Sequence, residues 1–283
     1  MENASQAVNG STTAEDLDRD EVLARAEIAT LSVMFTVTVV GNFAVLLALS
    51  ARPRKKLSRM YYFILHLSIA DLCTAFLSIL PQLAWDVTYR FRGGPIMCKV
   101  VKYGQTLGPY LSAYILMVTA LDRYQAVYHP LAYCSWTSRR SKFMVWTAWV
   151  FALGFCVPQL VVFSYQEIGP NVFDCWATFI QPWGERTYVT WYCVSVFIVP
   201  FTVLAATYSS ICRDILLHAG RSPQQQGNCS PLISRAKMNA VKQMVAVLFL
   251  YVVCSAPFIC AQLWATWDEL AHTRPFFKGM QSP

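Results

Sequence analysis

Charged side chains are scarce in this chain. Asp, Glu, Lys and Arg make up 14% of its 283 residues, whereas a soluble domain carries about 25%. Hydrophobic residues make up 55% of the chain, and the mean hydropathy is +0.38. This composition argues against a soluble globular domain and indicates a membrane protein.

The residue patterns of enzymes and transporters are missing too. The sequence has no Ser/His/Asp set and no phosphate-binding loop, so we do not expect an enzyme. Its four histidines are scattered without metal-ligand spacing, and we expect no metal site. They are His66, His129, His218 and His272. A transporter would show internal repeats or pairs of helices broken by Gly and Pro, and the sequence shows neither.

The start of the chain lacks a basic segment followed by a cleavage site. We therefore expect the first apolar span to serve as an uncleaved signal anchor. The formal net charge of +7 would suggest a nucleic-acid partner in a soluble protein. Here the basic residues follow membrane topology instead, so no nucleic-acid partner is expected.

What the chain does have is six apolar stretches, each long enough for a transmembrane helix in a lipid bilayer. They lie at about 27–50, 61–85, 98–128, 143–165, 187–217 and 240–266. The pattern predicts an all-α membrane protein: an N-terminal tail (1–26), a helix bundle (27–267) and an atypical C-terminal tail (268–283). The last segment is too short and too polar for a further span.

The basic residues set the orientation. They gather in the loops after the first, third and fifth spans, which share one side if the spans alternate. They are Arg52, Arg54, Lys55, Lys56, Arg59, Arg139, Arg140, Lys142, Arg213, Arg221, Arg235 and Lys237. The positive-inside rule places this side in the cytosol and the N-terminus outside. Asn3 and Asn9 then begin glycosylation sequons in the extracellular tail, whereas the Asn228 sequon faces the cytosol.

The ten cysteines resemble a disulfide framework only until they are placed on the spans. Several fall inside apolar stretches, where a free thiol behaves as a small hydrophobic group. Only Cys98 and Cys175 clearly fall in expected extracellular loop regions. We therefore predict one disulfide, joining the third helix to the second extracellular loop.

The third span carries the most specific features. It begins near Cys98 and ends in an Asp-Arg-Tyr triplet. Lys102 lies within this span, and a charged group in hydrocarbon is costly, so it should face a watery cavity or a partner. Because a helix facing lipid on all sides could not keep such residues, this helix is expected to run through a bundle.

The triplet leads to a resemblance. Asp122, Arg123 and Tyr124, followed by Pro130 and Leu131, resemble the end of the third helix in rhodopsin-like G-protein-coupled receptors. The alternative is an arginine that only reaches the membrane interface. The resemblance implies a rhodopsin-like bundle with six of the usual seven transmembrane helices. It also implies that these five residues couple the receptor to a heterotrimeric G protein, which would dock around Arg123 and contact Pro130 and Leu131.

Polar residues inside the spans extend this resemblance. Asn42 and Asp71 match the polar anchors of helices one and two, and Ser112 matches a partner of Asp71. By resemblance Asp71 is the carboxylate of a sodium site, whose remaining ligands come from helix seven. Tyr208 and Pro257 match switch positions of helices five and six. Ser255 stands where the family usually has a tryptophan.

Segments at the outer ends of the spans narrow the family. Among them are Leu80-Pro-Gln-Leu-Ala-Trp-Asp86, Val101-Lys-Tyr-Gly-Gln105, Asp174-Cys-Trp-Ala177 and Gln262-Leu-Trp264. Together they resemble the vasopressin/oxytocin receptors, over residues 19 to 268. The resemblance implies a cyclic neuropeptide as ligand, with Arg19, Glu27 and Asp86 meeting its exocyclic tail. Ser78 departs from the family, which usually has a glutamine there.

The outer polar residues suit such a ligand. An amidated peptide offers many amides, and glutamine both donates to and accepts from amides. We expect a pocket of glutamines with Lys102: Gln82, Gln105, Gln159 and Gln262. A monoamine receptor would need a carboxylate at Gln105. The alternative is that each glutamine joins helices by hydrogen bonds.

These features predict a plasma-membrane receptor for a vasopressin/oxytocin-like peptide that signals through a G protein. Binding would shift a two-state bundle toward a form with helix six displaced outward. The alternative is a truncated, non-signalling form that binds or retains full-length receptors, itself held in the endoplasmic reticulum. Because the tail after the sixth span is too short for a seventh helix, and because Ser255 replaces the usual tryptophan, we expect that the chain does not signal on its own.

Overall fold

The computed structural model describes residues 21–51, 59–129, 138–219 and 231–268. Five residues of the predicted sites lie outside these ranges: Asn3, Asn9, Arg19, Pro130 and Leu131.

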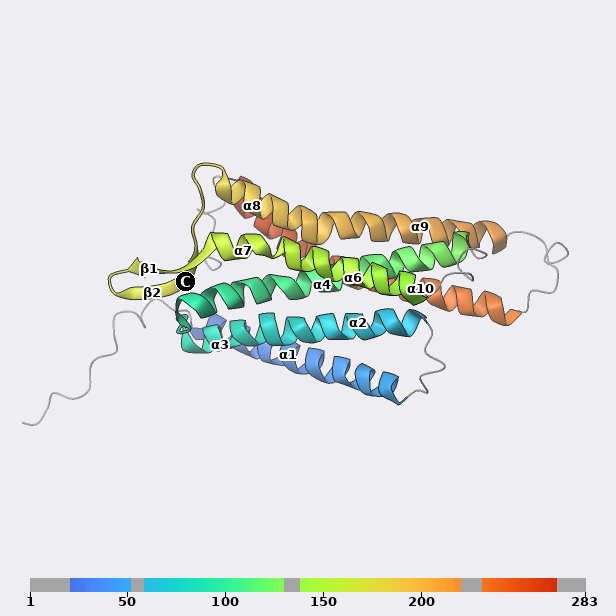
Figure 1. Cartoon of the computed structure of the whole chain (residues 1–283), viewed down its shortest axis with the longest axis horizontal. Helices are drawn as coiled ribbons and strands as arrows, with labels where there is room; N and C mark the ends of the chain where they lie inside the picture. The colour runs from blue at the N-terminus through green and yellow to red at the C-terminus, as the bar shows by residue number, and fades with distance from the viewer. Residues whose placement is uncertain (1–20, 52–58, 130–137, 220–230, 269–283) are drawn as a thin grey trace, which may run out of the picture.

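The described residues form a bundle of helical rods that run side by side (Figure 1). In chain order the rods are α1 (Glu21–Ser50); α2 (Arg59–Thr74), η2 (Ala75–Ile79) and α3 (Leu80–Thr88); α4 (Gly94–Tyr128); α6 (Ser138–Phe155) and α7 (Val157–Val162); α8 (Gly184–Cys193), η3 (Val194–Ile198) and α9 (Val199–Ala219); and α10 (Pro231–Trp267). The predicted class, an all-α membrane bundle, is confirmed.

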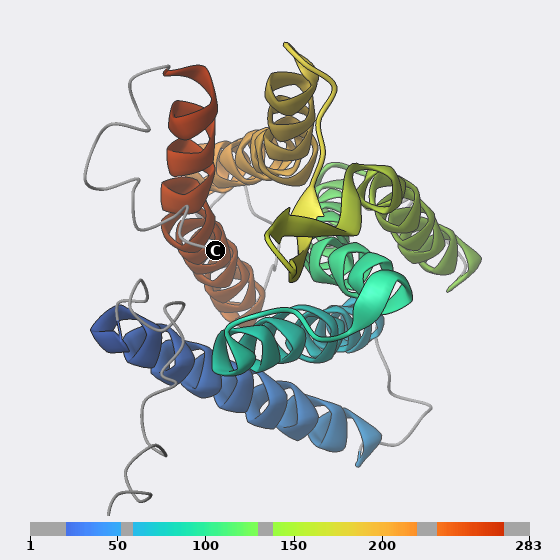
Figure 2. The same cartoon turned by 90° about the vertical axis from the view of Figure 1, so that its left-hand side faces the viewer.

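The third rod, α4, lies at the centre. It packs against α2, α6 and α9, which surround it in the end-on view of Figure 2. Among the described residues, five helical segments are long and apolar enough to cross a membrane, and the more polar α4 is not one of them. Because α4 is covered by other helices, it can keep polar residues that lipid would not tolerate.

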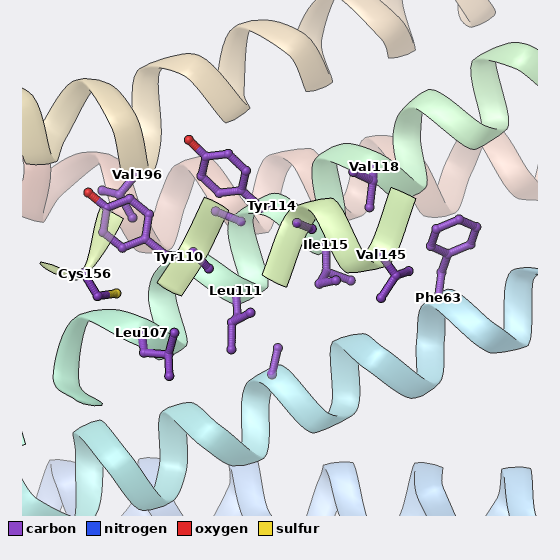
Figure 3. Close-up of a cluster of buried hydrophobic side chains, with 14 of the residues drawn as sticks. Phe63, Leu107, Tyr110, Leu111, Tyr114, Ile115, Val118, Val145, Cys156 and Val196 are labelled. Atoms are coloured by element: carbon purple, nitrogen blue, oxygen red, sulfur yellow. The ribbon is translucent and has the colours of Figure 1, made fainter. Parts of the chain in front are cut away.

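The apolar core lines α4. Leu107, Leu111 and Ile115 are buried there, in one cluster with Phe63 of α2 and Val145 of α6 (Figure 3). By contrast, many apolar residues of α1 and α10 are exposed, including Val37 and Phe249. The bundle is therefore held together mainly through α4.

Two π-helical turns interrupt the rods, and each lies just before a proline. η2 precedes Pro81 and η3 precedes Pro200. Proline has no backbone N–H, so the carbonyl four residues earlier loses its helical donor. A wider turn accommodates this loss without ending the helix.

The structure corrects the fourth span. Helix α7 ends at Val162, and residues 163–165 belong instead to strand β1 (Phe163–Gly169). This strand pairs antiparallel with β2 (Val172–Ala177), with Phe163 opposite Ala177. The span was drawn too long because Phe163 and Tyr165 continue the apolar run, and a short run does not separate strand from helix.

The hairpin lies over one end of the bundle and is fixed there (Figure 2). We call this the outer end and the opposite end the inner end, following the orientation predicted from the basic residues. Cys98 and Cys175 form a disulfide with a Cα–Cα distance of 5.5 Å, which confirms the predicted pairing. Cys73, Cys156, Cys193, Cys212, Cys254 and Cys260 are free thiols. Within the described residues this is the one bridge, as expected from the placement of the cysteines.

Candidate functional site

The outer end of the bundle contains a short relay of hydrogen bonds. Gln105 on α4 donates through Nε2 to Oε1 of Gln82 on α3, at 3.0 Å. Gln82 in turn donates through Nε2 to Oδ1 of Asp86, at 2.9 Å. All three side chains are half-buried. The relay therefore joins two neighbouring helices through partly exposed polar groups.

Lys102 lies one turn from Gln105 on α4 and points at aromatic rings. Its Nζ lies 4.3 Å from the ring centroid of Trp85 and 5.0 Å from that of Phe163. A cation over an aromatic face is stabilised by the ring quadrupole, the more so when desolvated. This supplies the partner that the sequence demanded for a lysine within a span.

The other predicted peptide contacts are spread around this relay. Gln159 on α7 is 4% exposed and donates to the hydroxyl of Tyr188 on α8. Gln262 is half-buried on α10, and within the described residues no hydrogen bond joins it to the other three glutamines. Glu27 is exposed on α1. The structure thus joins Gln82 and Gln105 directly, whereas Gln159 and Gln262 stand on separate helices.

A polar pair lies deeper in the bundle. Ser112 on α4 donates through Oγ to Oδ1 of Asp71 on α2, at 2.8 Å. Asn42 on α1 donates instead to the Thr38 carbonyl of its own helix, at 3.0 Å. Hard cations take about six oxygen ligands, and the carboxylate of Asp71 with the hydroxyl of Ser112 suits part of such a set. A sodium ion at Asp71 stays a prediction.

The inner end of α4 carries the Asp-Arg-Tyr triplet. Asp122 is 1% exposed, and its Oδ2 pairs with Nη2 of Arg123 at 2.8 Å. Tyr124 stacks on Tyr128, with ring centroids 4.5 Å apart. Tyr124 also packs against the apolar cluster formed by Ala120 of α4 with Leu204, Tyr208 and Ile211 of α9. The triplet therefore lies where α4 meets α9, at the end of the bundle opposite the hairpin.

Residues of the switch positions lie along α9 and α10. Tyr208 is buried in a small apolar cluster with Ala120, Leu204 and Ile211. Pro257 lies inside α10. Tyr208 thus contacts the inner half of α4, whereas Pro257 lies nearer the outer end of α10.

Sequence reasoning missed several contact residues of the outer end. Trp85, Phe163 and Tyr188 touch Lys102 or Gln159, and Asp174 fastens the hairpin. Trp85 could have been found, because it lies one turn after Gln82 on the same helix face. Phe163 and Tyr188 could not, because their approach depends on how the hairpin and α8 fold back.

Comparison with known proteins matches this architecture. The family model for the 7 transmembrane receptor (rhodopsin family) matches residues 41–280. The chain belongs to this family. Among curated relatives, it is 39% identical to the oxytocin receptor of Ovis aries over 297 residues, covering 94% of this chain and 75% of that receptor.

Two further relatives of the rhodopsin family give the same result. The chain is 38% identical to the vasopressin V1b receptor of Homo sapiens, over 90% of this chain and 67% of that receptor. It is 35% identical to the isotocin receptor of Catostomus commersonii, over 98% of this chain and 75% of that receptor. The chain is therefore a rhodopsin-family receptor of the vasopressin/oxytocin type, a multi-pass membrane protein and not an enzyme.

Proposed function

We propose that this receptor binds a vasopressin/oxytocin-like cyclic peptide at its outer end and activates a heterotrimeric G protein at its inner end. Its relatives are named for peptides of this class. One structural observation supports the ligand most strongly: the relay from Gln105 through Gln82 to Asp86, with Lys102 beside it.

This relay suits amide recognition. Each glutamine amide carries two N–H donors and a carbonyl acceptor, the same groups that a peptide backbone presents. A bound peptide would exchange the Gln105–Gln82 bond for bonds of its own, at little net cost in hydrogen bonding. Lys102 and its aromatic neighbours would stay in place to receive a peptide carbonyl or ring.

The remaining contacts extend this site. Gln159 on α7 and Gln262 on α10 would hydrogen-bond to further amides of the peptide. Arg19 and Glu27, together with Asp86, would contact its exocyclic tail. This arrangement requires the N-terminus outside the plasma membrane, as the distribution of basic residues predicts.

At the inner end, Asp122, Arg123 and Tyr124 would control access to the G protein, with Pro130 and Leu131 contacting it. The Asp122–Arg123 ion pair fixes the arginine beside its own helix. Outward displacement of α10 would open the space around Arg123, so peptide binding would shift the bundle toward that form. The relatives described above are all named as receptors, and nothing in the described structure supports a non-signalling fragment. We therefore propose a signalling receptor in place of the non-signalling form that the short tail and Ser255 led us to expect.

Saturation binding of labelled vasopressin- and oxytocin-type peptides to cells expressing this chain tests the proposal. We expect saturable binding to the wild type. Gln105→Ala should weaken it by about 1–3 kcal/mol, or about 5- to 150-fold, because buried amide groups lose their partner.

The control is Gln125→Ala, which removes the same amide from the same helix about 30 Å further along. Gln125 is half-buried near the inner end, so this variant should bind the peptide with wild-type affinity. Equal affinity of the wild type and Gln105→Ala would remove this glutamine from the site. Equal losses in both variants would show a general effect on α4.

A further inference from the structure

Helix α4 contains a proline in its interior, close to the proposed peptide site. This residue, Pro109, lies four positions after Gln105. In an α-helix, the carbonyl of each residue accepts from the N–H of the residue four positions further on. Because proline has no N–H, the main-chain carbonyl of Gln105 is left without its regular helical donor.

The backbone of α4 does not supply another donor. Pro81 and Pro200 each follow a π turn, in which an N–H donates to the carbonyl five residues back. By contrast, α4 is α-helical over its whole length, Gly94–Tyr128. The N–H groups on either side of Pro109 therefore pair with carbonyls of their own, four residues back, and not with that of Gln105.

Side chains do not fill this place either. Within the described residues, no side-chain donor bonds to the Gln105 carbonyl. The hydroxyl of the next residue, Thr106, donates instead to the carbonyls of Lys102, at 3.4 Å, and Tyr103, at 3.1 Å. Backbone carbonyls inside a protein rarely lack a donor, and in a membrane span such a group is tolerated where it lines a cavity. The Gln105 carbonyl is therefore open to a donor from outside the chain.

This carbonyl lies on the polar side of α4. Lys102, Gln105, Pro109 and Ser112 are separated by three, four and three residues, which places them along one side of the helix. All four are half-buried. A helical carbonyl points along the axis toward the residue four positions on, so the open one lies between the side chains of Gln105 and Pro109. The side-chain amide and the main-chain carbonyl of Gln105 thus share one side of the helix.

We propose that the main-chain carbonyl of Gln105, which Pro109 leaves open, accepts a hydrogen bond from a main-chain N–H of the bound peptide. The inference rests on the proposed receptor function, which supplies the peptide. It adds to the site an acceptor that is distinct from the side-chain amide. Because this acceptor belongs to the main chain, Gln105→Ala leaves it in place.

Saturation binding to a variant at position 109 tests this. Pro109→Ala supplies the missing N–H and so closes the carbonyl, and alanine suits the interior of a helix better than proline does. We expect the affinity for the parent peptide to fall by about two- to tenfold, the equivalent of one hydrogen bond. A tag on the N-terminus, stained on intact cells, counts the surface receptors of each variant.

The matched control carries lactic acid in place of Pro109, introduced by nonsense suppression. Lactic acid has the methyl group of alanine but an ester oxygen where alanine has its N–H, so it lacks both the donor and the proline ring. The Gln105 carbonyl stays open, and we expect wild-type affinity for the parent peptide. Equal losses with alanine and lactic acid would assign the effect to the ring and overturn the proposal, as would wild-type affinity of Pro109→Ala.

A series of peptides, each with one backbone amide replaced by an ester, identifies the donor. On the wild type, the ester at the donor position should bind about two- to tenfold more weakly than the parent peptide. On Pro109→Ala, this difference should disappear, because the carbonyl is already occupied. Every other ester should keep the same ratio to the parent on both receptors. The proposal is refuted if no ester changes its ratio between them.

The two proposals fail in different ways in this experiment. If the wild type binds the parent peptide saturably but no ester changes its ratio, the receptor function stands and the role of the Gln105 carbonyl is refuted. If wild-type receptors at the cell surface bind none of the parent peptides, the peptide assignment fails and the inference fails with it.

Discussion

At the scale of single residues, Asp174 shows how one carboxylate can hold the β1–β2 hairpin in place. It is 1% exposed, and its Oδ1 accepts from the N–H of Phe91 at 3.3 Å and from that of Cys175 at 2.7 Å. Its Oδ2 lies 3.7 Å from Nη1 of Arg90. The disulfide and this carboxylate therefore fasten the same corner of the hairpin to the bundle.

We predict that Asp174→Ala destabilises this corner and lowers the thermal unfolding temperature in detergent. Each hydrogen bond to a charged group contributes about 1.5–3 kcal/mol, and the N–H groups left behind are buried. Glu167→Ala is the control, because Glu167 is an exposed carboxylate of the same hairpin that accepts from the Asn171 N–H. Equal unfolding temperatures for both variants would refute a special role for Asp174.

Some residue-level features could be predicted from the sequence, and others could not. The Cys98–Cys175 pairing followed from placing each cysteine relative to the apolar spans. The need of Lys102 for a partner followed from the cost of a charge in hydrocarbon. Which groups supply that partner did not follow, because the contact of Phe163 with Lys102 depends on how β1 leaves the end of α7 in the folded chain.

At the scale of elements, close approach of α2 and α4 depends on glycine. A Cβ built on Gly108 would lie 2.6 Å from the Cα and 2.8 Å from the Cβ of Thr74. Backbone atoms cannot move away as the end of a flexible side chain can. A residue with a side chain at Gly108 therefore has to push the two helices apart.

Gly108→Ala should accordingly lower the stability of the bundle by about 1–3 kcal/mol, the usual cost of overpacking. The control is Gly154→Ala on α6, where a Cβ meets nothing within 4 Å. There the better helix propensity of alanine should leave stability unchanged or slightly raised. Thermal unfolding in detergent compares the two variants, and a Gly108→Ala protein as stable as Gly154→Ala would contradict this packing.

The helical rods were predictable because a span in hydrocarbon needs a minimum length and must satisfy its backbone hydrogen bonds internally. Interruptions within them were harder to foresee. Pro81 and Pro200 mark where a backbone N–H donor is missing from the helix. A π turn, a kink or a break in the helix can each accommodate a missing donor, so the sequence does not tell which one forms. The hairpin of β1 and β2 was missed for a different reason: the first residues of β1 continue the apolar run of the fourth span, and its partner strand lies several residues further along the chain.

At the scale of the whole molecule, α4 runs from the proposed peptide site to the Asp-Arg-Tyr triplet. Lys102 and Gln105 lie near its outer end, Ser112 near its middle and Asp122 at its inner end. Because α4 packs against α2, α6 and α9, a displacement of α4 at the outer site would also affect the positions of these three helices. Signalling thus requires that ligand binding at the outer end of α4 changes the structure at its inner end.

Second-messenger responses of cells expressing this chain test that dependence most directly. Calcium and cyclic-AMP signals are recorded against the concentration of vasopressin- and oxytocin-type peptides, with a tag on the N-terminus stained on intact cells to count surface receptors. The account predicts a dose-dependent response to at least one peptide that moves to higher concentrations in Gln105→Ala. Cells that display the tag at the surface, yet give no response to either peptide, would contradict it.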